Sequence, residues 1–314
     1  MRKVYVKLWL TALFWGGAFV AGKHVSQHLG PCGIAFLRFA TASVLLLVLT
    51  RWQEGRWPRL NAAQTVSIAL LGATGIFSYN IMFFKGLSLI EAGRASLIIA
   101  TTPAFIALSS ALFLRERLGP VRIAGIFLSV AGAVVVVSRG SFQWGSSDVL
   151  GVGELLILGC VLSWVAYSLI GKIVMRGLSP LVAVTYSVVV GTAALFVSTC
   201  LEGLSENVSR ASLLDWLAIL YMAVFATVIG FVWFYEGVKR VGATRAGLLI
   251  NLVPIFAVLL AFLLLKEPIT ASLGVGAAMV VSGVYLTNQI PPPSRDATTT
   301  PAREMSPQRT PVRR

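Results

Sequence analysis

The sequence predicts an all-α integral membrane protein whose ten transmembrane helices form two inverted repeats of five helices each. Composition, the number of apolar stretches and an internal duplication predict this fold. Hydrophobic residues make up 57% of the 314 residues and charged residues only 12%, and the mean hydropathy is +0.84. A chain of this composition has too few polar side chains to cover a water-soluble globule of this length.

The apolar stretches give the number of spans. A helix needs roughly 17 to 25 apolar residues to cross a bilayer, and ten stretches of about this length are separated by charge, glycine or proline. The first resembles a secretory signal peptide, but its residues recur in the sixth, which no signal peptidase removes, so we interpret it as a span. The predicted spans are 5–22, 32–50, 65–84, 95–114, 119–138, 151–171, 181–200, 213–234, 246–265 and 271–288.

The duplication runs through nearly the whole chain. Residues 83–132 align with 234–283 at a constant offset, with 16 identical positions out of 50 and no gap. A second match aligns Trp15 with Trp164 at an offset of 149. Such repeats are identified before a fold is assigned. We therefore expect a first repeat over 1–140, a second, inverted repeat over 141–290 and a disordered, basic cytoplasmic tail over 291–314.

The positive charges predict the orientation. With the N-terminus inside, the inner loops and tail hold 19 Lys and Arg residues and the outer loops hold 6. This bias places both termini in the cytoplasm, and we expect the plasma membrane, in a bacterium the inner membrane. The net charge of +14 follows mostly from this topology, so we expect the lipid bilayer and no nucleic acid as a partner. The oligomer is expected to be a monomer or a homodimer.

An odd number of spans per repeat predicts a mechanism as well as a fold. The second repeat must enter the membrane in the opposite sense to the first, as in many secondary transporters, which bind substrate near the midplane between their repeats and work by alternating access. The alternative is that duplication only built a stable bundle.

Several strings also resemble a known family. GLSLIEAGRASLIIATTPAFIALSSALFLRERLG and its echo GVKRVGATRAGLLINLVPIFAVLLAFLLLKEP, with FWGGAFVAGK and FLRFATA, are similar to the drug/metabolite transporter superfamily, EamA type. The resemblance covers about residues 7–288. It implies a ten-helix basket that moves small metabolites, in a family whose members export amino acids and toxic aromatic or cationic compounds. A fold shared by so many functions leaves the cargo open.

Aromatic and weakly polar residues at membrane depth predict a substrate pocket. Deep tryptophans differ from those of the interfacial belt, and a buried ring with an N–H donor suits an organic solute. Polar side chains at this depth bond across helices or line a wet cavity. Two prolines should kink the fourth and ninth spans and act as hinges. The candidate binding residues are Trp15, Tyr79, Asn80, Phe83, Thr101, Thr102, Trp164, Tyr167, Trp233 and Asn251, and the hinges are Pro103 and Pro254.

Charges at the ends of the same two spans predict gates. If these spans pack antiparallel, Arg94 meets Glu267 at the outer face and Arg245 meets Glu116 at the inner face. The alternative is that these residues only anchor helix ends in the headgroup region.

Other residues leave alternatives open. Arg38, the only charge well inside a span, could bind a substrate carboxylate or a structural partner. The glycines spaced seven apart in spans five and ten (Gly125, Gly132, Gly276 and Gly283) predict close helix contact, either internal or in a dimer. His24 and His28 lie four apart, but without a third ligand no metal site is expected, and no cofactor is expected.

Together these features predict a secondary transporter that exports small organic metabolites. Because no Asp or Glu lies deep in a span, we expect neutral or zwitterionic solutes such as aromatic amino acids. An enzyme is not expected, since no Walker A, G-x-S-x-G or H-E-x-x-H motif occurs. The alternatives are an intramembrane enzyme, a receptor scaffold or, within the same fold, a proton-coupled drug or cation antiporter.

Overall fold

The computed structural model describes residues 2–114, 118–139, 151–174, 178–241 and 243–288, and every regular element among them is helical. The first repeat contains α1 (Arg2–Val25), α2 (Pro31–Glu54), α3 (Ala62–Leu71), η1 (Gly72–Ser78), α4 (Tyr79–Leu89), α5 (Ala92–Ile99), α6 (Thr102–Leu114) and α7 (Pro120–Val137). The second contains α8 (Val152–Val174), α9 (Pro180–Glu202), α10 (Leu204–Arg210), α11 (Leu213–Tyr221), η2 (Met222–Ile229), α12 (Gly230–Val241), α13 (Ala243–Ile250), α14 (Val253–Leu265) and α15 (Ala271–Thr287). The predicted tail, 291–314, lies outside the described residues.

The predicted membrane fold is confirmed. In the described part of the chain, eight helical stretches are long and apolar enough to cross a bilayer, and α14 and α15 are shorter apolar helices. The third and eighth spans each consist of three helical segments in line, α3–η1–α4 and α11–η2–α12. Proline at the first helical position, as in Pro31, Pro120 and Pro180, starts several spans where its missing N–H costs no helical hydrogen bond.

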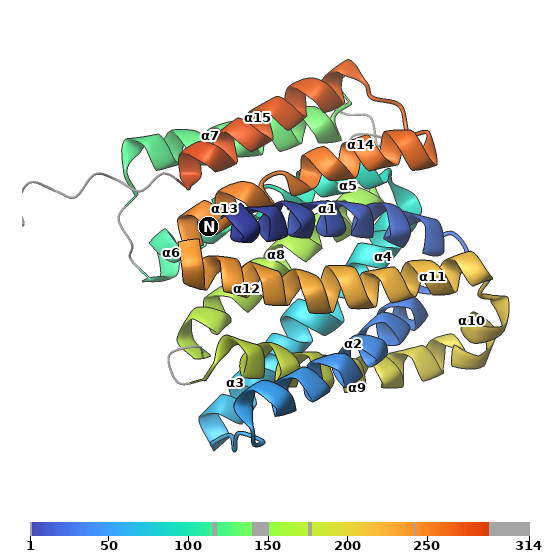
Figure 1. Ribbon diagram of the computed structural model, residues 1–314. Helices are drawn as coiled ribbons and strands as arrows, with labels where there is room; N and C mark the ends of the chain where they lie inside the picture. Colours follow the sequence, from blue (N-terminus) through green and yellow to red (C-terminus); the bar gives the residue numbers. More distant parts are fainter. Residues whose placement is uncertain (1, 115–117, 140–150, 175–177, 242, 289–314) are drawn as a thin grey trace, which may run out of the picture.

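Equivalent spans of the two repeats pack against each other, the fourth and ninth through the first half of one and the second half of the other. The pairs are α7 with α15, α2 with α9 and α5 with α14. The remaining spans cross over between repeats: α8 packs on α4 and η1 of the first repeat, and α1 packs on α12 and η2 of the second. In Figure 1, α7 and α15 form one edge of the bundle, α2 and α9 lie toward the opposite edge, and α1 lies between α14 and α12. This exchange of partners is what an inverted duplication produces.

Two of the interfaces have recognisable physical causes. A Cβ added to Gly283 would lie 2.4 Å from the Ser129 amide nitrogen, so only glycine lets α15 approach α7 this closely. The sequence did not decide whether these glycines pack within one molecule or in a dimer, and the structure shows that they pack within the molecule. Between α2 and α9, the hydroxyls of Thr50 and Thr185 are 2.7 Å apart. Such hydroxyl bonds between membrane helices contribute about 0.6 kcal/mol each on average.

The fourth and ninth spans are broken rather than merely kinked. Each was predicted as one helix kinked at its proline, but α5 ends at Ile99 and α6 begins at Thr102, while α13 ends at Ile250 and α14 begins at Val253. Each break immediately precedes a proline, which has no N–H for the preceding turn and whose ring clashes with it.

The third and eighth spans share a different irregularity. Both η1 and η2 are π-helical, and they occupy equivalent positions at the repeat offset. The π-helix is rare, and it occurs frequently at functional sites. No pattern in the sequence predicted it.

Candidate functional site

A cavity of about 280 Å³ lies inside the bundle, where both broken helices and both π-helical segments meet. Its lining comes from both repeats and is mainly apolar and aromatic. The polar side chains among its lining residues are Arg38, Tyr79, Asn80, Ser96, Thr102 and Asn251. A largely apolar cavity with a few convergent polar groups is the usual form of a small-molecule site.

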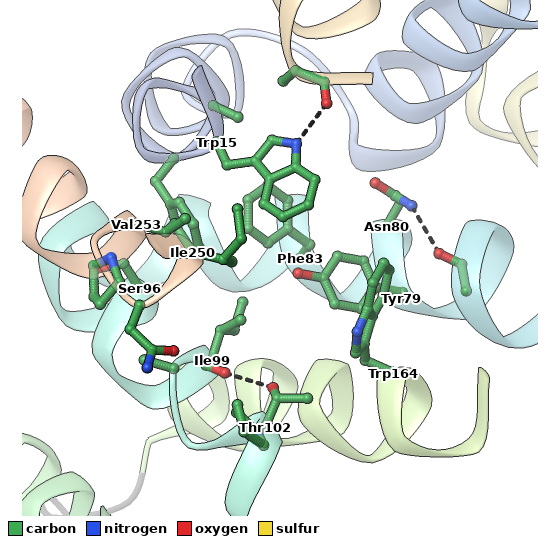
Figure 2. A pocket seen from close by; sticks show the side chains of 18 of the residues that line it. Trp15, Tyr79, Asn80, Phe83, Ser96, Ile99, Thr102, Trp164, Ile250 and Val253 are labelled. Atoms are coloured by element: carbon green, nitrogen blue, oxygen red, sulfur yellow. Dashed lines mark hydrogen bonds between the residues drawn. The ribbon is translucent and has the colours of Figure 1, made fainter. Parts of the chain in front are cut away.

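Aromatic rings from different helices build one wall. Tyr79 stacks on Phe83 with ring centroids 5.8 Å apart, and its other neighbour, Trp164, is 5.4 Å away. Trp15 lies across the cavity and donates its indole N–H to the carbonyl of Ala226 in η2, at 2.8 Å (Figure 2). Because this bond fixes the ring, Trp15 presents a flat face of fixed orientation to the cavity.

The helix breaks supply backbone polarity. Ile99 and Ala100 at the end of α5, and Ile250 and Asn251 at the end of α13, all line the cavity. Last-turn carbonyls of a helix lack intrahelical partners and carry partial negative charge. The hydroxyl of Thr102 donates to one of them, the carbonyl of Ile99. The two breaks therefore bring two helix ends to the wall of the same cavity, as the discontinuous helices of secondary transporters do.

Among the described residues that line the cavity, Arg38 on α2 carries the only formal charge. Its Nε donates to the hydroxyl of Thr227 in η2 at 3.2 Å, and its Nη1 donates to the side-chain oxygen of Asn80 at 3.4 Å. The guanidinium carbon lies 4.9 Å from the ring centroid of Phe39. In the described part of the chain no carboxylate pairs with it. Arg38 therefore has structural hydrogen-bond partners and also lines the cavity, so the structure agrees with both interpretations.

The structure brings most of the predicted binding residues together but leaves three outside the lining. Trp15, Tyr79, Asn80, Phe83, Thr102, Trp164 and Asn251 line the cavity, together with the hinge residues Pro103 and Pro254. Thr101 is buried and donates its hydroxyl to the carbonyl of Ile98. Tyr167 lies behind Trp164, with ring centroids 5.0 Å apart. Trp233 faces elsewhere, near Phe14.

Sequence reasoning missed several lining residues. Phe231 occupies the position equivalent to Asn80 at the repeat offset. Because Asn80 was a candidate, this equivalence could have indicated that Phe231 also lines the cavity. The others carry no such signal, because phenylalanine and aliphatic residues are the normal filling of any membrane helix. They include Phe19, Phe39, Ile106 and, from α15, Val280, Val281 and Val284. Ser96, a polar lining residue, was also missed.

The predicted outer ion pair has a different partner. Arg94 pairs with Glu154 of α8, with 3.1 Å between Nη1 and Oε1, and it also donates to the carbonyl of Val137. Both charged side chains are almost fully buried. Arg94 therefore fastens α5 to α7 and α8, and the prediction that it meets Glu267 is wrong.

Glu267 instead caps a helix. Its two carboxylate oxygens accept hydrogen bonds from the amides of Ala92 and Gly93 at 2.8 and 3.0 Å. First-turn amides lack intrahelical partners and attract negative charge, so the helix end outcompetes the nearby arginine. For the inner pair, Glu116 lies outside the described residues, as does the side chain of Arg245.

A scan against protein families matches the EamA-like transporter family twice, over residues 2–138 and 151–289. The chain belongs to the EamA-like transporter family. Two matches in one chain agree with the internal duplication. The resemblance stated from the sequence is confirmed, and an EamA-like transporter is a membrane transporter rather than a member of an enzyme family.

Relatives of this EamA-like transporter cover nearly its whole length. The uncharacterized transporter YyaM of Bacillus subtilis (strain 168) is 28% identical over 90% of this chain and 92% of its own. A probable terminal-alkyne amino-acid exporter of Streptantibioticus cattleyicolor is 29% identical over 96% of this chain and 99% of its own. A protein of known crystal structure matches with a TM-score of 0.65 and 21% identity, over 91% of this chain and 98% of its own. That likeness concerns the fold alone.

Proposed function

We propose that this transporter exports small zwitterionic solutes with an apolar side chain, aromatic amino acids being the first candidates. The observation that carries the proposal is the lining of the cavity: one guanidinium, two asparagines and helix-end carbonyls among aromatic rings. Arg38 would bind the carboxylate, because its N–H groups match a carboxylate in geometry and charge. The carbonyls at the ends of α5 and α13 would accept hydrogen bonds from the ammonium group.

Two further observations support this solute class and the direction of transport. The described residues of the cavity lining include no Asp, Glu or His, which disfavours dications, since an unpaired cation at membrane depth is costly. A relative that aligns along almost the entire chain is described as a probable amino-acid exporter. Export would take the solute from the cytoplasm across the plasma membrane, with both termini inside, as the loop charges favour.

Alternating access is the proposed mechanism. The bundle has two ends. At one of them α1 ends and α2, α5 and α11 begin, and we call it the α11 end. The opposite end is called the α6 end. At the α11 end, α5 packs closely on α14, whereas among the described residues the equivalent halves at the α6 end, α6 and α13, form no comparable packed pair. This asymmetry supports a state closed at the α11 end. Glu267, which joins α14 to the first turn of α5, would be part of that closure.

The proposal is tested by solute counterflow in proteoliposomes. The panel contains aromatic and aliphatic amino acids, aromatic amines and organic dications. Wild-type protein is expected to exchange aromatic amino acids. Trp164→Ala and Asn251→Ala should each slow exchange about five- to thirtyfold, since an aromatic wall and a buried hydrogen bond are each worth about 1 to 2 kcal/mol.

Trp233→Ala is the matched control, because it removes the same side chain from outside the cavity. It should leave exchange near the wild-type rate at equal reconstituted amounts. Unchanged exchange in both cavity variants, or no exchange of any amino acid while other solutes are carried, would refute the proposed site and cargo.

A further inference from the structure

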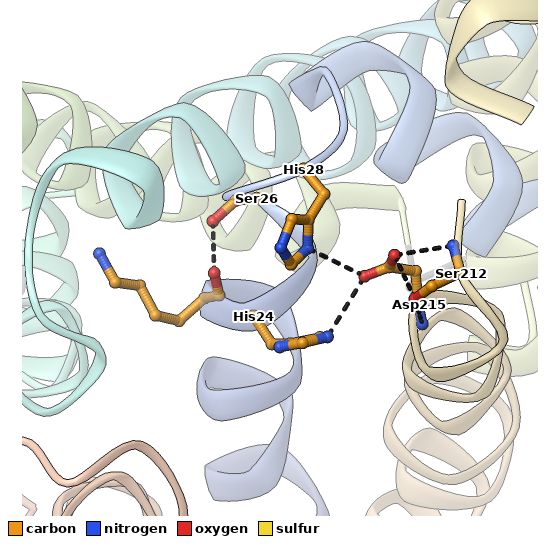
Figure 3. A network of polar contacts seen from close by, with 6 residues as sticks. His24, Ser26, His28, Ser212 and Asp215 are labelled. Carbon is orange, nitrogen blue, oxygen red and sulfur yellow. Dashed lines mark hydrogen bonds and ion pairs between the residues drawn. The ribbon is translucent and has the colours of Figure 1, made fainter. Parts of the chain in front are cut away.

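Two histidines and an aspartate meet at the α11 end (Figure 3), and none of the three is among the residues that line the solute cavity. His24 lies in the last turn of α1, His28 in the turn that follows, and Asp215 in the first turn of α11. The chain contains only 2 histidines, and both are in this cluster. Because α1 and α11 belong to different repeats, the cluster joins the two halves of the molecule.

The distances in the cluster match those between the ligands of one metal ion, and the contact from His28 is also a long hydrogen bond. The Oδ1 atom of Asp215 lies 3.3 Å from Nε2 of His24 and 3.3 Å from Nδ1 of His28. Hydrogen bonds from N–H to oxygen prefer 2.7 to 3.2 Å, and the buried Nε2 of His24 has no hydrogen-bond partner. Ligand atoms around tetrahedral zinc, with bonds of about 2.0 to 2.1 Å, lie about 3.3 Å from one another. All three atoms lie within 4.8 Å of one another.

The carboxylate is held so that one oxygen faces the imidazoles. The other oxygen, Oδ2, accepts hydrogen bonds from the Ser212 amide at 3.0 Å and the Ser212 hydroxyl at 2.7 Å. The Asp215 side chain is only 2% exposed. A buried carboxylate gains most from a cation beside it, and a metal-binding carboxylate whose second oxygen is fixed in this way is pre-oriented for one bond.

We propose that His24, His28 and Asp215 bind a divalent cation of the zinc class, which ties α1 to α11. Nε2 of His24, Nδ1 of His28 and Oδ1 of Asp215 would be the protein ligands, and water would fill the fourth position. Two imidazoles and one carboxylate suit zinc and its neighbours among the transition metals. The histidine pair lacked a third ligand in the sequence because Asp215 lies 187 residues beyond His28.

Binding is measured on the purified, full-length protein in detergent after chelator treatment. Zn²⁺ is titrated by calorimetry, and Co²⁺ by the visible absorption that distinguishes a tetrahedral from an octahedral ion. One site per chain is expected. His28→Gln and Asp215→Asn should each weaken Zn²⁺ binding at least ~100-fold, because each removes one of three protein ligands. Ser212→Ala should weaken it by ~10 to 100-fold through the loosened carboxylate.

Glu206→Gln is the control, because it removes an exposed carboxylate near the same end and should leave affinity unchanged. The absence of saturable Zn²⁺ binding, or binding that survives both His28→Gln and Asp215→Asn, would overturn the proposal. If Asp215→Asn does not fold, His28→Gln decides alone, since that side chain is 50% exposed. The measurement needs no transport activity, so its outcome is independent of the proposed cargo.

Discussion

At the scale of single residues, carboxylates of the second repeat cap helices of the first at the α11 end. Glu202 accepts from the amide of Gly33 at 2.8 Å at the start of α2, as Glu267 does at the start of α5. Oppositely charged residues in the aligned repeats predicted ion pairs, because a sequence displays side-chain charge. It does not display the partial charge of a helix end, and that charge determined where Glu267 binds.

Replacing Glu267 with glutamine should loosen the α11 end. A carboxylate at a helix N-terminus is worth about 0.3 to 2 kcal/mol, so Glu267→Gln should raise the population open at that end by about two- to thirtyfold. The measurement uses a chain without its native cysteines that carries Ser96→Cys, on the α5 side of the cavity. An impermeant thiol reagent is added at the α11 end, and the rate at which it labels this cysteine is measured. Glu206→Gln should not change the rate, and equal labelling in both variants would mean that Glu267 has no part in closure.

At the scale of helices, sequence patterns located the spans but not their irregularities. Long apolar stretches, proline and repeated glycines predicted ten spans, the positions of the breaks and the tight packing of α7 on α15. The π-helical segments η1 and η2 left no trace in the hydrophobic pattern, because a membrane helix that is apolar on all sides shows no period that a change of helical pitch could disturb.

The glycine seam between α7 and α15 gives a prediction with a control on the same helix. Gly283→Ala should destabilise the fold by about 1 to 3 kcal/mol, because the new methyl group meets backbone that cannot move aside. Gly274→Ala should be neutral or slightly stabilising, since nothing lies within 4 Å of its added carbon and alanine favours helix. Thermal unfolding in detergent compares the two, and equal midpoints would show that α7 and α15 do not depend on this contact.

At the scale of the whole molecule, energy coupling depends on carboxylates, and none occurs among the lining residues that the structure describes. Buried Glu154 and Asp215 lie near span ends and have partners, Arg94 and the histidines respectively. A proton-driven exchanger needs a carboxylate that protons and substrate reach in turn. Transport should therefore follow the solute gradient.

An imposed pH gradient of one or two units should change the initial rate of amino-acid exchange in proteoliposomes by less than about twofold. A potassium-clamped membrane potential separates this effect from that of charge movement. Concentrative uptake driven by the pH gradient alone would contradict the expectation and would direct attention to Glu154.

The site was predictable to the extent that chemistry is visible in residue type. Tryptophan, tyrosine and asparagine at membrane depth are unusual enough to indicate a pocket, and seven of the ten candidates line one. The failures have a common cause. Trp233 also falls at membrane depth in the sequence, but depth does not reveal which way a helix faces. The cluster of His24, His28 and Asp215 consists of residues that only the fold brings together.

The central claim is that Arg38 selects a carboxylate-bearing solute. It is tested most directly by counterflow of phenylalanine compared with phenethylamine, which lacks only the carboxylate. Wild-type protein should exchange phenylalanine at least about tenfold faster than the amine. Arg38→Gln should lower the phenylalanine rate about 10- to 100-fold, because a charged hydrogen bond contributes about 1.5 to 3 kcal/mol, and it should not lower the amine rate. Equal rates for both solutes in wild-type protein, or an unchanged preference in Arg38→Gln, would contradict the account.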